Sequence, residues 1–155
     1  MNIAVFASHG GSDLQAIMDG CKNNKINANV VVVISNNGDS MALQRAKNEN
    51  IPAYHLSAKR MGNEEILAHE ILKVLSDYDV DMIFLAGYMR MLHVSVLEKY
   101  HNRIFNIHPA LLPKFGGKGM YGMNVHNAVI KAGEIETGVT IHRVNAEYDS
   151  GEIVA

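Results

Sequence analysis

The sequence predicts an α/β fold, a Rossmann-like doubly wound domain built on a mostly parallel sheet. Short apolar runs alternate with segments of helical period along the chain, which is typical of βαβ units. The run 30–35 is five β-branched residues and a serine, as expected of a strand that is buried on both faces of a parallel sheet. The 155 residues are one domain's worth of chain, so we expect a single domain over residues 1–155.

Apolar or β-branched runs predict the strands. The first run begins almost at once, at Ile3, and the last alternates apolar and polar residues, which indicates one wet face. Glycine, proline and Asn-Gly turn signals bound most of the runs. In chain order the expected strands are residues 3–8, 30–35, 53–56, 81–86, 104–107 and 139–144.

The segments between these runs predict helices. Two of them open with the Ser-x-x-Gln or Ser-x-x-Glu spacing of a capping box, at Ser12 and Ser95, and Ser40 can cap a third. A fourth has apolar residues at a helical period, and a fifth ends at Gly133. In chain order the expected helices are residues 12–23, 40–50, 63–76, a short helix from residue 95, and residues 124–132.

Composition excludes several classes of protein. The 14 Lys and Arg against 16 Asp and Glu give a net charge of −2, which argues against a partner that is nucleic acid or a membrane surface. The single cysteine, Cys21, cannot form an internal disulfide and is interpreted as a buried core thiol. No apolar run approaches the roughly 20 residues that span a bilayer. Met1–Phe6 lacks the features of a signal peptide, so we expect a soluble cytoplasmic protein.

Two further kinds of chemistry find no support in the sequence. The 8 histidines invite a metal site, but none pair at the H-x-x-H or H-x-x-x-H spacing, so we expect no metal. No serine lies in a G-x-S-x-G elbow, which leaves a covalent serine mechanism without support.

Ligands of a doubly wound sheet bind beyond the carboxyl ends of its strands, and unusual residues follow several of the predicted strands. Ser8–Asp13 joins a strand to a helix N-terminus through two glycines, whose free N–H groups suit an anion. A tight turn that binds nothing is the alternative. Arg90 follows another strand within an apolar stretch, where it can clamp a carboxylate or carbonyl, or be a surface arginine with a packed stem.

The segment Asn106–Pro113 carries the strongest local signal. Asn106 and His108 point to the same side of a strand, so the amide can hydrogen-bond a developing oxyanion while the imidazole moves a proton. A hydrogen-bonded structural histidine is the alternative. Asp149 lies in the turn Tyr148–Gly151, and a carboxylate beside a catalytic histidine stabilises the imidazolium. An ordinary turn is the simpler local interpretation of that segment.

Five segments together resemble the folate-dependent formyltransferases. N-I-H-P-A-L-L-P at residues 106–113 resembles the family signature N-x-H-x-S-L-L-P, and T-G-V-T-I-H at 137–142 and Y-D-S-G at 148–151 follow at the family's spacing. The opening, residues 2–17, and L-A-G-Y-M-R at 85–90 are similar to one branch of that family. That branch formylates the amine of glycinamide ribonucleotide in de novo purine biosynthesis. The resemblance covers the whole chain and implies the formyltransferase fold.

The resemblance also implies roles for particular residues. Asn106, His108 and Asp149 fall on the family's catalytic trio. Gly11, Ser12 and Asp13 fall on the turn that binds the ribonucleotide phosphate. The implied folate-binding residues are Met89, Arg90, Met91, Leu92, Asn106, Asn145, Ala146, Glu147, Tyr148 and Asp149. The implied reaction is direct transfer of a formyl group from 10-formyltetrahydrofolate, the co-substrate, with neither a metal nor a covalent enzyme intermediate.

The chain departs from the family pattern in three places. His9 and Asp13 stand where the family usually has Gly and Asn, and acidic residues around Glu64 stand where some members place a helper arginine. The sequence also stops inside an expected strand where family members continue. A C-terminally truncated chain is therefore an expectation. Two other functions stay open: a catalytically impaired module that binds nucleotide or folate, and a formyltransferase with another amine acceptor. Either way we expect small-molecule substrates, and a monomer or a homodimer.

Overall fold

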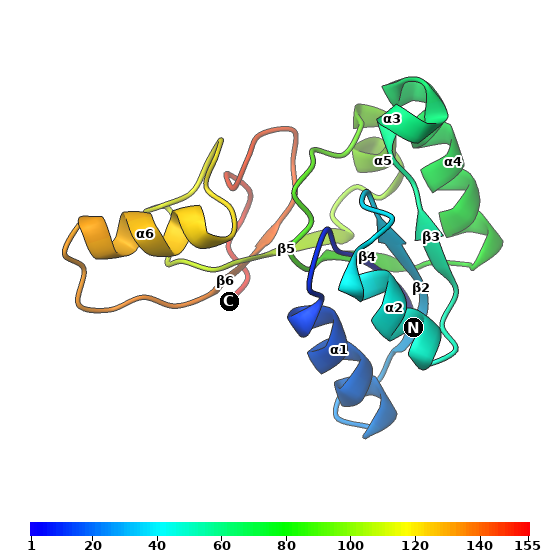
Figure 1. The fold of residues 1–155 in the computed structure, drawn as a ribbon, viewed down its shortest axis with the longest axis horizontal. Helices are drawn as coiled ribbons and strands as arrows, with labels where there is room; N and C mark the ends of the chain where they lie inside the picture. The colour runs from blue at the N-terminus through cyan, green and yellow to red at the C-terminus, as the bar shows by residue number, and fades with distance from the viewer.

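The strands of the protein form one six-stranded sheet in the order β3-β2-β1-β4-β5-β6 (Figure 1). The computed structural model describes residues 1–155. The first five strands in the chain run parallel, and β6 pairs antiparallel with β5. This is the strand order of a doubly wound Rossmann-like sheet, so the predicted fold class is confirmed. The strands are β1 (Asn2–Phe6), β2 (Asn29–Ser35), β3 (Ala53–His55), β4 (Met82–Leu85), β5 (Ile104–His108) and β6 (Thr140–Arg143).

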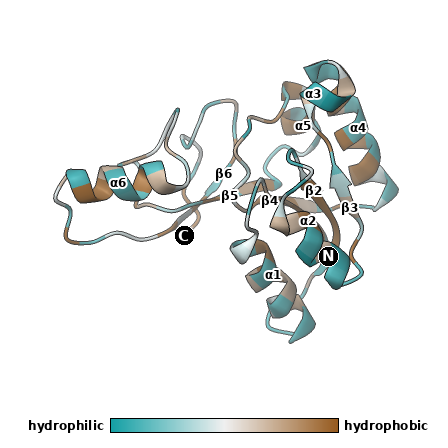
Figure 2. Ribbon diagram, viewed as in Figure 1, coloured by the Kyte–Doolittle hydropathy of each residue, from teal (hydrophilic) through white to brown (hydrophobic).

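Helices cover both faces of the sheet, each over its own apolar cluster. On one face, α1 and α2 bury side chains such as Leu14 and Ala42 against Val5. On the other face α4 and α5 pack residues such as Leu75 and Val96 against the larger cluster. In Figure 2 the brown apolar stripe of α4 faces the strands. The helices are α1 (Ser12–Lys22), α2 (Met41–Asn48), α3 (Ala58–Met61), α4 (Glu64–Asp77), α5 (Val94–Lys99) and α6 (Met123–Lys131).

The expected capping boxes are wrong, although the helices themselves are where they were predicted. Helix α1 begins at Ser12 itself, and its cap is Gly11 in the left-handed conformation with φ 69°, with no side-chain cap. A capping serine needs extended backbone, which the Gly-Gly turn does not provide. Helix α5 is capped by His93, whose Nδ1 accepts the Ser95 N–H at 3.3 Å. Ser40 does cap α2, accepting the Leu43 N–H.

Residues 109–139, which we call the lobe, project away from the body of the sheet and helices (Figure 1). The lobe carries α6, which agrees with the predicted helix 124–132 within one residue at each end. Neither apolar cluster contains a residue of the lobe, so it is joined to the body mainly through β5 and β6. None of the helices has the length and apolar character needed to cross a membrane.

Ser8 connects three strand ends at the middle of the sheet. Its backbone N–H donates to the Gly87 carbonyl oxygen at 3.0 Å, and its Oγ donates to Asn36 Oδ1 at 2.6 Å. The same Oγ accepts the Met89 N–H at 2.8 Å. The segments that follow β1, β2 and β4 are therefore held together where the strand order reverses, the usual place for a ligand in such a sheet.

Candidate active site

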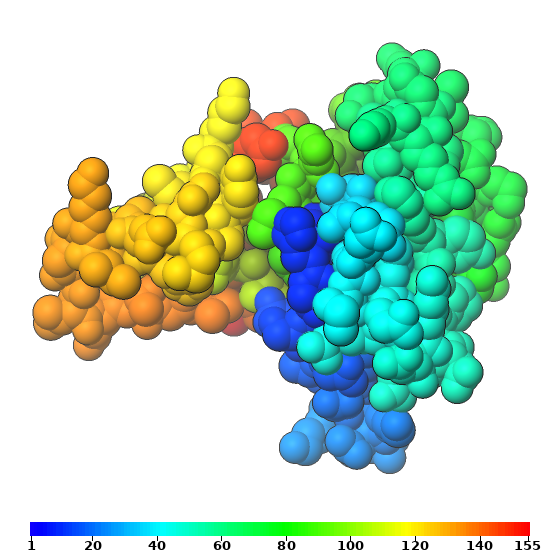
Figure 3. All heavy atoms as spheres, in the orientation of Figure 1, coloured from blue at the N-terminus to red at the C-terminus, as the bar shows by residue number.

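One large cleft runs along the carboxyl ends of the strands. Its volume is about 1370 Å³, more than the roughly 300–1,000 Å³ of a pocket for one drug-sized ligand. Figure 3 shows the hollow between the lobe and the body. All of the predicted site residues line this cleft except Gly11 and Ala146. The structure therefore brings the predicted catalytic, anion-binding and folate-binding segments to one continuous space.

The end of the cleft that holds the predicted catalytic residues is built by the antiparallel pair β5 and β6. In their register Asn106 lies opposite His142, and His108 lies opposite Thr140. Directly opposed residues project from the same face of a sheet, so all four side chains share one side. Thr140 Oγ1 donates to the Ala110 carbonyl oxygen at 2.6 Å, which fixes the chain just beyond His108. The alternation in β6, which predicted a strand with one solvent-exposed face, thus places His142 on the same face as His108.

The Asp149 carboxylate sits between the two histidines. Its Oδ1 lies 3.5 Å from His108 Nδ1 and 3.3 Å from His142 Nε2. The same oxygen accepts a hydrogen bond from Asn106 Nδ2 at 3.3 Å, and Oδ2 accepts the Gly117 N–H at 2.9 Å. The Asp149 side chain is only 9% exposed. A buried carboxylate with this many donors is ionised and held in one orientation.

Charge and burial act in opposite directions on these groups. Burial alone would raise the pKa of Asp149, but the hydrogen bonds from His142 and the Gly117 N–H, with His108 nearby, lower it below 3.8. Burial alone would lower the pKa of His142, but the Asp149 carboxylate and the Arg143 carbonyl oxygen raise it above 6.5. The pair therefore favours a charged aspartate beside a charged histidine.

Glycines make this arrangement possible. Asp149 itself has φ 51°, a left-handed conformation that a short polar residue tolerates. A Cβ on Gly151 would collide with the Arg143 carbonyl oxygen, so only glycine lets the chain turn back along β6 there. A Cβ on Gly116 would lie 2.6 Å from Leu112 Cδ2 and 3.1 Å from Asp149 Cβ. The D-S-G motif is thus needed for close backbone approach as well as for its carboxylate.

His108 is held on both sides of its ring. Nε2 lies 2.8 Å from the Phe115 carbonyl oxygen, and the side chain is 3% exposed. A carbonyl can only accept, so Nε2 carries a proton, and Nδ1, beside Asp149, is the atom that gains or loses one.

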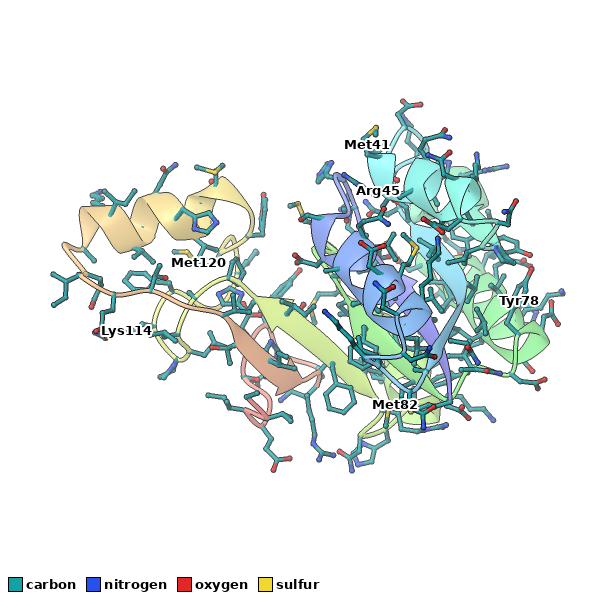
Figure 4. The ribbon with its side chains drawn as sticks, turned by 90° about the horizontal axis from the view of Figure 1, so that it is seen from below. Met41, Arg45, Tyr78, Met82, Lys114 and Met120 are labelled. Carbon is teal, nitrogen blue, oxygen red and sulfur yellow. The ribbon has the colours of Figure 1, made fainter.

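The turn between β1 and α1 forms the opposite end of the cleft. The N–H groups of Gly11, Ser12 and Asp13 make no hydrogen bond within the protein, as expected of a helix N-terminus. Arg45 of α2 supports the turn, since its Nε donates to the Gly10 carbonyl oxygen at 2.8 Å (Figure 4). Gly11 does not line the cleft because it packs against α2: a Cβ there would lie 2.9 Å from Ala42 Cα.

The segment after β4 forms the middle of the cleft. Tyr88 and Leu92 turn into the core, and burial raises the pKa of Tyr88 to about 12. Arg90 and Met91 are exposed on the cleft, and Arg90 makes no ion pair with another residue. A free guanidinium beside apolar side chains suits a carboxylate or carbonyl group of a ligand.

Sequence reasoning missed several residues of the cleft. His142 lies in a family motif, but no local pattern gives it a role, because only the register of β5 and β6 shows that it shares a face with Asn106. The lobe adds Lys118, Met120 and His126 to the lining, and Figure 4 shows Met120 on this lobe. No local pattern marks those residues, because a long connection brings them over the cleft.

Comparison with known proteins identifies the family of the chain. A sequence model of the formyl transferase family matches residues 1–155. The chain is 43% identical over 154 residues to the chloroplastic phosphoribosylglycinamide formyltransferase of Arabidopsis thaliana, covering 99% of this chain and 53% of that protein. It is 38% identical to phosphoribosylglycinamide formyltransferase of Escherichia coli, covering 99% and 70%. The chain thus spans about half the length of the plant relative.

The fold is also similar to that of a solved structure. Glycinamide ribonucleotide transformylase 1 from Symbiobacterium toebii superposes with a TM-score of 0.92 at 35% identity, covering all of this chain and 71% of that one. The likeness extends over β1 to β6 and the lobe together.

Proposed function

The chain belongs to the formyl transferase family, and we propose that it transfers a formyl group from 10-formyltetrahydrofolate to the amine of glycinamide ribonucleotide, a step of de novo purine biosynthesis. One observation carries the proposal. Asn106, His108 and Asp149 meet at one end of a cleft whose other end is a helix N-terminus with free N–H groups. An acyl-transfer centre and an anion site in one space suit a phosphorylated amine acceptor.

The cleft has the right character for a reduced folate between these ends. Apolar side chains such as Leu85, Met89 and Val144 line it, and Arg90 and the segment 145–149 supply polar groups. Such a pocket, mostly apolar with a few placed polar groups, is typical of sites for small organic ligands and cofactors. The bound folate would supply the formyl group.

The residues at the catalytic end have complementary tasks. Asn106 and a protonated His108 stabilise the negative charge that develops on the formyl oxygen when the amine attacks. Asp149 stabilises the proton at His108 Nδ1, 3.5 Å away, and orients the ring together with the Phe115 carbonyl oxygen. His108 then donates the Nδ1 proton to the folate nitrogen as the carbon–nitrogen bond to the folate breaks, and the proton that the attacking amine gives up restores the imidazolium.

The turn at the start of α1 binds the phosphate of the acceptor. The N–H groups of Gly11, Ser12 and Asp13 and the positive end of the α1 dipole attract an anion. The Asp13 carboxylate in the first turn opposes it, while His9, Asn36 and Asn37 line the same end and offer donors.

An absorbance assay of the purified chain with a 10-formyl folate analogue tests the proposal. We expect deformylation that requires glycinamide ribonucleotide and falls sharply when the acceptor lacks its phosphate. Deformylation without an acceptor would indicate a hydrolase. Binding of both ligands without turnover would indicate a binding module instead, and either result would contradict the proposal.

A further inference from the structure

His142 is a buried histidine at the catalytic centre that the proposed mechanism does not use. Its side chain is 3% exposed, and it lies opposite Asn106 in the register of β5 and β6. Both of its ring nitrogens have partners in the protein. The side-chain contacts through which His142 can influence the reaction are those to Asn106 and Asp149.

The proton on one ring nitrogen is fixed by the backbone. His142 Nδ1 lies 2.9 Å from the carbonyl oxygen of Arg143, which can only accept a hydrogen bond. Nδ1 therefore carries a proton whether the ring is neutral or charged. All gain or loss of charge takes place at Nε2.

Nε2 has two neighbours with opposite requirements. Asn106 Nδ2, at 3.0 Å, is a donor and needs a lone pair on Nε2. Asp149 Oδ1, at 3.3 Å, is an acceptor and needs a proton on Nε2. A neutral His142 satisfies the amide, and a charged His142 satisfies the carboxylate.

This conflict determines what Asn106 can offer to a substrate. With a neutral His142, the two N–H bonds of the amide are used by His142 and Asp149, at 3.0 and 3.3 Å, and the amide oxygen is the end left free. An oxygen repels an oxyanion. With a charged His142, two donors would face each other. Turning the amide end for end removes that conflict but also breaks the hydrogen bond from Asn106 to Asp149, so the Nε2 proton of His142 must then serve both the amide oxygen and the Asp149 carboxylate.

We propose that His142 is a positioning residue whose protonation at Nε2 turns the Asn106 amide so that its N–H faces the cleft. The catalytic meaning of this switch rests on the proposed function, but the switch itself does not. In the charged state, the imidazolium holds Asp149 and Asn106 offers a donor to the oxyanion.

The Asp149 carboxylate supports the charged state. The titratable groups that face His142 are Asp149, from the loop after β6, and His108, from β5, whose protonated form opposes a second positive charge. The side chain of Arg143 lies on the other face of β6 and pairs with Glu152 at 2.9 Å. Burial opposes a charge on His142, but the Asp149 carboxylate and the Arg143 carbonyl oxygen outweigh it and raise its pKa above 6.5.

Nuclear magnetic resonance of the full ¹⁵N-labelled chain tests the switch without ligands. The Asn106 side-chain amide, identified by its loss in Asn106→Ala, is followed from pH 5 to pH 9 beside the His142 ring signals. We expect the amide and ring signals to share one midpoint, and in His142→Gln we expect the amide to stay constant. Arg143→Gln, a matched change on the other face of β6, should keep the shared midpoint. An amide that ignores the His142 titration, or titrates equally in His142→Gln, would overturn the proposal.

Kinetics of two variants test the catalytic meaning. His142→Gln keeps an N–H that can donate to Asp149 at every pH, and His142→Phe keeps none. We expect His142→Phe to lose up to about 10²-fold in kcat, the effect of one oxyanion donor, with little change in KM. His142→Gln should keep most of kcat. Its kcat should also no longer decline as the pH rises, because the decline in the wild type comes from deprotonation of His142.

The titration and the kinetics test different claims, the amide switch and the proposed function. A Gln variant with the wild-type pH profile would overturn the positioning role. Coupled amide and ring signals in a protein that turns over no acceptor would refute the proposed function and leave the switch standing.

Discussion

The two ends of the cleft differ in the groups that form them, which are side chains at one end and backbone N–H groups at the other. At the β5–β6 end the candidate site consists of side chains: Asn106, His108, His142 and Asp149 make a hydrogen-bonded network that leaves only the Asn106 amide oxygen without a partner. At the α1 end the proposed binding groups are backbone N–H groups, and Gly11 matters there because it has no side chain. The groups at the first end depend on which residue types are present, and those at the second end depend on the backbone conformation.

This difference predicts two kinds of mutational response. Truncating a side chain at the catalytic end removes a reacting group but leaves the strands paired. Adding a side chain at the anion end moves the backbone that binds. Kinetic constants should therefore respond at one end, and the affinity for one ligand at the other.

The largest effect is expected at the catalytic end. Replacing His108 with alanine removes the proton donor, and general acid catalysis is worth about 10²–10⁴-fold in rate. We expect kcat to fall by that factor while the affinity for a folate analogue is kept. His69→Ala, an exposed change on α4, is the matched control and should keep kcat. Near wild-type turnover of His108→Ala would refute the catalytic assignment.

The next effect is expected at the anion end. Gly11→Ala places a Cβ 2.9 Å from Ala42 Cα at a residue with φ +69°. The left-handed conformation alone costs about 1–2 kcal/mol with a Cβ, and the turn can relieve this cost only by moving its N–H groups. Restoring the binding geometry would then cost about as much, so the affinity for glycinamide ribonucleotide should fall about tenfold. Folate affinity should change little, as measured by calorimetry.

Gly10→Ala provides the control for that change, because its added Cβ meets nothing within 4 Å. It should bind both ligands like the wild type. Equal loss of both ligands in Gly11→Ala would show that the fold itself is disturbed and that the two ends are not independent.

A smaller effect is expected at Ser8, which joins the two ends. Ser8→Ala leaves the Met89 N–H without its acceptor at 2.8 Å, in a site where Ser8 is 1% exposed. A buried unsatisfied donor costs about 1–3 kcal/mol, measurable by urea unfolding. The Ser12 hydroxyl has only a 3.5 Å contact to Asp13, so Ser12→Ala should change stability by less than about 0.5 kcal/mol. If Ser8→Ala and Ser12→Ala lowered the free energy of unfolding equally, Ser8 would not be the residue that joins the strand ends.

The smallest effect is a pH dependence of stability that only the catalytic end should show. The pKa of Asp149 is lowered, so its contribution is present above pH 3.8 and is lost as the pH falls through its folded pKa. The pKa of His142 is raised, so its contribution is complete below pH 6.5 and is lost as the pH rises through its folded pKa. Both contributions to stability are therefore fully present only between pH 3.8 and pH 6.5.

A series of Tm measurements from pH 3 to pH 9 checks this window. The Tm advantage of wild type over Asp149→Asn should shrink at both ends of the range, since removing the carboxylate also removes the shift of His142. The change should be modest, because ~1 kcal/mol moves the Tm of a domain of this size by about 2–4 °C. A Tm difference that is constant with pH would contradict the assigned charges.

The sequence predicted the parts of this comparison that depend on periodicity and motif. The runs at residues 30–35 and 104–107 became β2 and β5, because apolar periodicity determines strands that are buried in a parallel sheet. Local polar spacing was less reliable: Ser12 and Ser95 have the spacing of capping boxes, but Gly11 and His93 are the caps. Competing local hydrogen bonds decide caps, and a spacing rule does not weigh them.

Contacts between distant segments were the hardest to predict. The motif containing Asp149 indicated a carboxylate near His108, but nothing local indicated that His142 would share it, or that the Phe115 carbonyl oxygen would hold the His108 ring. These contacts depend on strand register and on the lobe folding back, and both are properties of the whole fold.

The central claim is that His108 and Asp149 act as one unit through the proton at Nδ1. A double-mutant cycle of His108→Ala and Asp149→Asn, read in kcat, tests it most directly. The account predicts that the double variant lies within about threefold of His108→Ala, because Asp149 has nothing to stabilise once the imidazole is gone. Losses that multiply would show that the two residues act independently and would contradict the account.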